Sequence, residues 1–153
     1  KTIPGGENAS IDRMMNETAT RETFRIKGES TITVNDYQNG RKFDDALCYS
    51  FYPIDLHTKN GVIPKHLKRG VVPTIPRGSL IPKGSTNLMV AGRCLSSDRL
   101  ANSAARVQAS CMGMGQAAAC TAVLAAKSST TPKEVPLGEI HALLREHGAI
   151  VPA

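Results

Sequence analysis

The residues with the most suggestive spacing for chemistry are the glycines of the run 113–118, Gly-Met-Gly-Gln-Ala-Ala, which satisfies the pattern GxGxxA. This pattern binds a dinucleotide when a strand ends at the first glycine, so that backbone amides and a helix N-terminus face the pyrophosphate. Glu134 follows at about the distance of the acidic residue that contacts the ribose in such sites. The residues before Gly113 have a helical pattern, however, so we expect both glycines inside a helix, where they allow close packing.

A strand, a loop and a helix just upstream form a second candidate. The apolar run 87–92 predicts a strand buried on both faces, as in a parallel sheet. After the loop 93–103, an alanine-rich segment predicts a helix over about 106–127, with Asn102 or Ser103 as its N-cap.

The N-terminus of this predicted helix is suited to an anion. Its free amides and about half a positive charge would stabilise negative charge. Arg93 and Arg106 add formal positive charge. A capped helix with two exposed arginines would explain the same residues, so composition alone leaves both interpretations open.

The cysteines do not form a metal-binding pattern. They lack a CxxC pair and have no zinc-site spacing with any of the four histidines. We therefore expect no metal site. The four are interpreted as small buried residues or unpaired thiols: Cys48, Cys94, Cys111 and Cys120.

Composition indicates one ordinary globular domain. The 153 residues are 41% hydrophobic and 21% charged, which argues against disordered, collagen-like and coiled-coil chains. Because no window approaches about 18 apolar residues, we expect no membrane partner. The first residues lack the apolar core of a secretion signal, which favours the cytoplasm.

The net charge of +6, from 19 basic and 13 acidic residues, makes an anionic partner worth considering. The densest basic cluster contains Lys65, His66, Lys68 and Arg69. It contains no aromatic residue, and aromatic residues are only 4% of the chain, which argues against a nucleic-acid partner that binds by base stacking. A non-enzymatic domain that binds an anionic partner through this cluster is the alternative to an enzyme.

The first half of the chain predicts a small antiparallel β region. We interpret 1–19 as an irregular lead-in. Apolar and polar side chains alternate in 23–27 and again in 31–34, which predicts a hairpin with one buried face. Residues 49–57 predict an edge strand, because Pro53 cannot donate a ladder hydrogen bond.

Short helical turns and loops fill the remainder. We expect one turn from Asp36 to Gly40 with Asn35 as its cap, and a second over 44–48. The proline-rich stretch 58–83 predicts an extended loop.

The final predicted helix, 137–147, has Leu137, Ile140, Leu143 and Leu144 on one stripe and ends before Gly148. Together, the predicted elements give an α+β fold class.

These segments, in this order, resemble the C-terminal part of the FAD-dependent oxidoreductase family related to the fumarate reductase flavoprotein group. The resemblance spans about residues 20–150 and depends on an ordered series of short motifs. The motifs are 75–83, 87–96, 105–107, 111–112 and 115–118, preceded by 21–28, Asp36, Gly40, Phe43, Asp45 and 52–57.

The resemblance implies an FAD cofactor and an unidentified organic substrate that exchanges a hydride or electrons with the flavin. It implies that the strand 87–92 joins a Rossmann-like FAD-binding sheet and that the next helix directs its N-terminus at the flavin. By this analogy the cofactor-binding residues are Gly92, Arg93, Ser103, Arg106, Val107 and Gln108.

Two residues are candidates for catalysis on the substrate side. The resemblance suggests His57 as a proton donor or acceptor and Arg77 as a clamp for an anion or carbonyl. Each also has an ordinary structural explanation, since His57 could close a strand and Arg77 could form an ion pair.

The chain departs from the family in two places. Ala119 stands where a glycine is common, and the dinucleotide-binding GxGxxG opening of the family is not found. We therefore expect a C-terminal fragment, inactive alone, in which 20–86 supply the substrate side and 87–153 the end of the FAD domain. Its partner would be the missing N-terminal FAD-binding portion. Without that portion, the apolar strand 87–92 favours self-association into a homo-oligomer.

Overall fold

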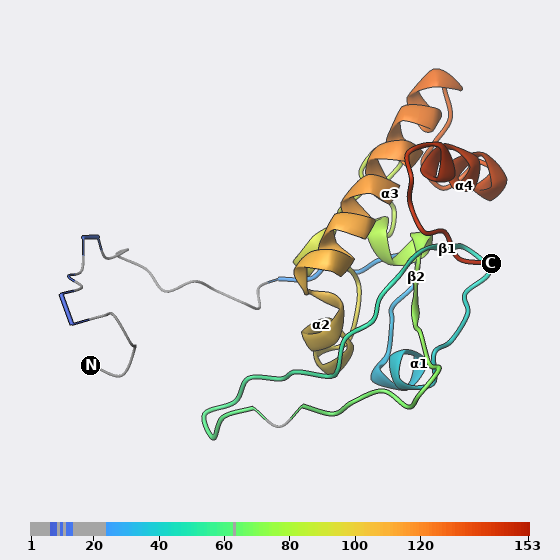
Figure 1. Ribbon diagram of the computed structural model, residues 1–153. Coiled ribbons are helices and arrows are strands. Elements are labelled where there is room, and N and C mark those ends of the chain that lie inside the picture. The colour runs from blue at the N-terminus through green and yellow to red at the C-terminus, as the bar shows by residue number, and fades with distance from the viewer. Residues whose placement is uncertain (1–6, 9, 11, 14–23, 63) are drawn as a thin grey trace.

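The computed structural model describes residues 7–8, 10, 12–13, 24–62 and 64–153, and it has an α+β fold (Figure 1). Most of the predicted lead-in 1–19 lies outside the described residues. The elements, in chain order, are helix α1 (Val34–Gln38), strands β1 (Ala46–Tyr49) and β2 (Thr74–Pro76), the 3₁₀ helices η1 (Arg77–Leu80) and η2 (Gly92–Cys94), and helices α2 (Arg99–Ala105), α3 (Gln108–Lys127) and α4 (Leu137–Glu146).

The long helix α3 is the centre of the arrangement (Figure 1). It contacts β1, η2 and α4, while α2 lies at its N-terminal end. Strands β1 and β2 form a two-stranded antiparallel sheet, in which Cys48 pairs with Ile75 and Tyr49 pairs with Thr74. The core lies where the sheet meets the helices, and its members include Leu47, Ile75, Met114, Ile140 and Leu144.

Helix α4 confirms the prediction from its apolar stripe. Ile140 and Leu144 are buried, and Leu137 and Leu143 pack against the same core. The helix ends at Glu146, and Gly148 has φ +74°, a left-handed conformation that glycine adopts without strain.

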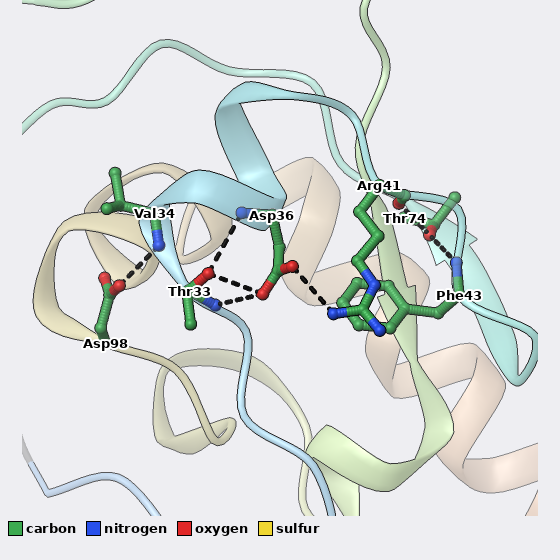
Figure 2. A network of polar contacts seen from close by, with 7 residues as sticks. All are labelled: Thr33, Val34, Asp36, Arg41, Phe43, Thr74 and Asp98. Carbon is green, nitrogen blue, oxygen red and sulfur yellow. Dashed lines mark hydrogen bonds and ion pairs between the residues drawn. The ribbon is translucent and has the colours of Figure 1, made fainter.

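Helix α1 begins two residues before the predicted start, and its cap is Thr33 rather than Asn35. The Thr33 hydroxyl accepts from the Asp36 amide at 3.1 Å, and the Asp36 carboxylate accepts from the Thr33 amide at 3.0 Å (Figure 2). This reciprocal pair of hydrogen bonds gives an acceptor to two backbone N–H groups at the start of the helix. Asp98 then joins two helices, because it accepts from the Val34 amide and also caps α2 through the Ala101 amide.

The predicted hairpin between 23–27 and 31–34 is wrong for its described part, 24–27 and 31–34. Both segments instead bond to the second half of the chain: the Ile26 amide donates to the Cys94 carbonyl at 2.9 Å and the Ile32 amide to the Ser96 carbonyl at 3.1 Å. Alternation indicates which side chains are buried, but it does not identify the segment with which the backbone forms hydrogen bonds.

Two further strand assignments are corrected. Residues 46–48, predicted as part of a helical turn, belong to β1, whereas 50–57 form no strand. The run 87–92 also forms no strand: the Val90 amide donates to the Leu80 carbonyl at 2.8 Å, and Leu88 is 52% exposed. Its apolar side chains therefore do not have the two covered faces that the sequence suggested.

The proline-rich stretch is a loop only in part. Residues 74–80 form β2 and η1, where Thr74 and Ile75 are buried in the core. Residues 51–62 and 64–73 belong to an arm that leaves the helices after β1 and returns to β2 (Figure 1). Reciprocal backbone bonds between Ile54 and Lys65, at 3.0 and 2.9 Å, tie the two sides of this arm together.

Helix α3 corrects the expectation about membrane-length segments. Its 20 residues have a window of mean hydropathy 1.3, long and apolar enough by length and composition to cross a membrane. One such helix is a weak indication, because the core helix of a soluble protein also has these properties. About 33% of the window is buried against the rest of the described structure.

Candidate functional site

One pocket gathers side chains from four separate segments around the start of α3. It encloses about 590 Å³. The base of the arm, η2, α2 and the first turn of α3 contribute its lining residues, which are Tyr52, Asp55, Arg93, Ser103, Arg106, Val107, Gln108 and Cys111.

A break between α2 and α3 places three of these residues. Arg106 ends α2 with φ −80° and ψ 0°, and Val107 is extended with φ −69° and ψ 155°. The chain therefore changes direction before α3 begins at Gln108, and the single helix predicted over 106–127 starts two residues late.

The predicted caps of this helix are wrong because both lie inside α2. The buried Asn102 amide group donates to the Arg93 carbonyl at 3.1 Å and to the Ser97 hydroxyl at 3.2 Å. The Ser103 hydroxyl donates to the Leu100 carbonyl at 2.7 Å and accepts from the Asp55 amide at 3.1 Å. These two side chains therefore hold η2 and the arm against α2.

The pocket combines a helix N-terminus with two guanidinium groups. Val107, the N-cap of α3, has no side chain that could accept from the first turn, and no described side chain caps this end. The free backbone N–H groups at the N-terminus of α3, together with the charges of Arg93 and Arg106, favour negative charge in the pocket. Asp55 supplies an opposing carboxylate.

Arg106 is held in place by the walls of the pocket. Its Nε donates to the Ser103 carbonyl at 3.3 Å, and its Nη2 donates to the Asp55 carbonyl at 3.2 Å. These bonds link the end of α2 to the base of the arm. The guanidinium is therefore oriented by the protein before a ligand binds.

A network of buried hydroxyl groups contacts the first turn of α3, which contributes to the pocket. The Tyr37 hydroxyl lies 3.0 Å from that of Ser50 and donates to the Tyr52 carbonyl at 3.2 Å. Ser50 lies 2.8 Å from the Ser110 hydroxyl in the first turn of α3. Burial raises the pKa of Tyr37, so this phenol stays protonated as a donor.

The structure brings together five of the six residues that the family resemblance assigns to the cofactor. Arg93, Ser103, Arg106, Val107 and Gln108 all line the pocket. Gly92 does not line it but begins the same 3₁₀ turn as Arg93, with φ +78°.

The two predicted catalytic residues lie outside the pocket lining. His57 is near it, because its Nε2 lies 3.5 Å from Oδ2 of the pocket residue Asp55. Arg77 instead joins η1 to the segment before α4, through donation to the Val135 carbonyl at 2.5 Å. Burial lowers the pKa of Arg77. Its position gives no support to a substrate-side role, which stays a prediction.

Sequence reasoning did not single out Tyr52, Asp55 and Cys111 as pocket residues. Cys111 lies four residues after Val107 and three after Gln108, and this helical spacing was a usable signal. Tyr52 and Asp55 belong to a segment without regular structure, where no periodicity indicates direction.

The run 113–118 lies within α3, as predicted, so its glycines do not form a dinucleotide-binding turn. A Cβ atom on Gly113 would lie 3.5 Å from the Cβ atom of Cys48, an ordinary contact between α3 and β1. Gly115 has open space around it among the described residues. Close packing through the glycines is therefore found at Gly113 only.

Comparison with known proteins identifies the family. The model of the family described as FAD dependent oxidoreductase matches residues 1–144. The chain belongs to this family, and FAD is the cofactor that the family implies. No curated protein and no solved structure matches the chain. The resemblance to FAD-dependent oxidoreductases is thus confirmed, and the relation to fumarate reductase flavoproteins stays a prediction.

Proposed function

We propose that the pocket at the start of α3 binds the flavin end of FAD in an oxidoreductase that acts on an organic substrate. The observation that carries this proposal is that five residues assigned to the cofactor by the family resemblance line one pocket, at a helix N-terminus that no described side chain caps. Family membership supports the cofactor independently of the pocket.

The pocket has the size and chemistry for part of a flavin. Its volume falls within the roughly 300–1,000 Å³ of small-molecule sites. The Gln108 amide, the Tyr52 hydroxyl and the two guanidinium groups are donors for ring carbonyls and nitrogens, and Asp55 is an acceptor. The positive end of α3 suits the negative charge of a reduced flavin.

When bound, FAD supplies the two-electron chemistry of the reaction. The residues of this chain bind and orient the ring, and their positive charges favour its reduced form. On the substrate side, we propose His57 as the proton donor or acceptor, positioned by Asp55 at the edge of the pocket. The contacts of Arg77 favour a structural function instead.

We further propose that this chain covers one side of the flavin and that a Rossmann-like portion, which holds the ADP half of FAD, covers the other. Several apolar side chains are exposed and would be buried by such a portion. The exposed fraction is 52% for Leu88, 74% for Met112 and 46% for Val123. The segment before Gly92 would then pair with the sheet of that portion. On this account, the isolated chain is inactive.

A second candidate function is supported by the arm. Lys65, Lys68 and Arg69 are all exposed, so this basic cluster is accessible to an anionic partner. Binding through such a cluster weakens steeply with rising salt, whereas retention of a flavin in a pocket depends mainly on buried contacts. Affinity for FAD measured at low and high salt therefore distinguishes the two functions.

The most specific test of the flavin proposal is a charge at the N-terminus of α3. Gln108 lines the pocket and is exposed, so Gln108→Glu places a carboxylate there, where it also favours the helix. The neighbouring Ala109 is exposed but does not line the pocket, and Ala109→Glu is the matched control. Both are made in the complete encoded polypeptide.

The measurement is the reduction potential of the bound flavin. We expect Gln108→Glu to lower it more than Ala109→Glu does, because the new charge opposes negative charge on the ring. Equal potentials in the wild type and Gln108→Glu would contradict the placement of the flavin in this pocket.

A further inference from the structure

One of the four cysteines lines the pocket, a second follows a pocket residue in the chain, and the other two lie in the core. Cys111 lines the pocket, and Cys94 ends the 3₁₀ turn η2 that supplies Arg93. Both are only partly buried. Cys48 and Cys120 are buried, and burial raises the pKa of the Cys48 thiol to about 12, which keeps it unreactive.

Both partly buried cysteines lie near the backbone around Gly92. The Cys94 thiol donates to the Ala91 carbonyl, with Sγ 3.3 Å from the oxygen. A Cβ atom on Gly92 would lie 3.6 Å from Sγ of Cys111 and 3.9 Å from its Cβ atom. Gly92 therefore lets η2 approach α3 closely at Cys111, whose own thiol donates to the Arg106 carbonyl with Sγ 3.2 Å from the oxygen.

The pKa of Cys111, on α3, depends on groups of η2. Burial raises the pKa of Cys111, the guanidinium of Arg93 opposes this rise, and a thiolate at Cys94 adds to it. The pKa of Cys111 therefore stays above its ordinary value, and Arg93 only limits the effect of burial. The thiolate, which is the reactive form in disulfide exchange, becomes more available as the pH rises.

We infer that Cys94 and Cys111 form a reversible dithiol–disulfide pair that exchanges two electrons with the flavin of this pocket. In the oxidising direction, two S–H bonds break and one S–S bond forms. The two electrons pass to the oxidised flavin, and the protons pass to the flavin and the solvent. The reverse step reduces the disulfide and reoxidises the flavin. The exchange rests on the proposed flavin site.

Closing the bond requires the two Cβ atoms to come within about 3.5–4.5 Å of each other. The one-turn helix η2 would shift towards α3 in the oxidised form. The pair would give the protein a second two-electron store beside its cofactor, with a thiol or disulfide compound as its external redox partner.

The first experiment detects the pair without any flavin activity. The complete polypeptide is equilibrated in glutathione buffers of graded potential, alkylated and mapped by peptide mass spectrometry. We expect a Cys94–Cys111 disulfide that forms and disappears reversibly. Cys94→Ser and Cys111→Ser should each abolish it, and Cys120→Ser should keep it. Failure to find this disulfide at any potential would overturn the inference.

The second experiment counts electrons. Anaerobic reductive titration should consume four electrons per flavin in the oxidised wild type and two in Cys94→Ser or Cys111→Ser. Two electrons per flavin in a wild type that contains the disulfide would overturn the exchange with flavin. A protein that binds no flavin contradicts the proposed function and the exchange together, while the disulfide map still shows whether the thiols pair. Circular dichroism confirms that each variant is folded.

Discussion

The hydroxyl of Ser50, just after β1, lies 2.8 Å from the hydroxyl of Ser110 in the first turn of α3, and both side chains are buried. Tyr37 completes the network from α1. The network thus joins α1 and the end of β1 to the first turn of α3, which is 60 residues further along the chain than Ser50. Because Ser110 lies in the same turn as Gln108, this network fixes the part of α3 that faces the pocket.

The network predicts unequal costs for its two serines. Ser110→Ala removes one hydrogen bond but leaves Ser50 bonded to Tyr37, so we expect the free energy of unfolding to fall by about 0.5–1.5 kcal/mol. Ser50→Ala removes the central member and strands the Ser110 hydroxyl, so we expect about 1–3 kcal/mol. Urea unfolding measures both. The double variant should cost less than the sum, and strict additivity would contradict the network.

Two glycines predict opposite effects of adding one methyl group. A Cβ atom on Gly28 would lie 2.7 Å from both the Gly78 carbonyl oxygen and Ser96 Cβ, so Gly28→Ala should destabilise by about 1–3 kcal/mol. Gly115 is inside α3 with open space, so Gly115→Ala should stabilise by about 0.5–1 kcal/mol. Thermal unfolding compares them, and a destabilised Gly115→Ala would show that the position needs glycine.

Elements with a strong local signal were predicted from the sequence. Helix α4 has its apolar residues at helical spacing and a glycine after its end, and it forms almost where predicted. Helix α3 was also predicted, because only two glycines interrupt a long run of helix-forming residues. Five of the pocket residues could be named in advance, because the family resemblance placed them by motif and not by local geometry.

Elements that depend on distant partners were not predicted. The segment 31–34 alternates as a strand does, yet its backbone bonds to Ser96 and Asp98, more than sixty residues away. The helix break at Val107 has no proline or glycine to announce it. The family resemblance suggests Arg77 as a site residue, and its bond to the Val135 carbonyl shows that it lies elsewhere.

The α1 capping box predicts a pH dependence of stability. Partial burial raises the pKa of Asp36, but hydrogen bonds from Thr33 and Arg41 outweigh it and hold the pKa below its ordinary value. The carboxylate therefore stabilises the fold above the ordinary pKa, near 4, and this stability is lost as pH falls through the lower folded value.

The test compares urea midpoints between about pH 5 and pH 2. Asp36→Asn should flatten the fall in stability over this range. Asp44→Asn, which changes an exposed carboxylate outside the capping box, is the control and should leave more of the fall in place. An identical pH profile for wild type and Asp36→Asn would show that the capping carboxylate does not contribute.

The central claim is that the pocket at the start of α3 holds the flavin, and a pocket-filling side chain tests it most directly. The measurement is the visible flavin absorption of the complete encoded polypeptide after free FAD is removed, for wild type, Gln108→Trp and Ala109→Trp. Both positions are exposed, so neither indole enters the core. Our account predicts that wild type and Ala109→Trp keep the flavin and Gln108→Trp loses most of it. Full retention by Gln108→Trp, or a colourless wild type, would contradict the account.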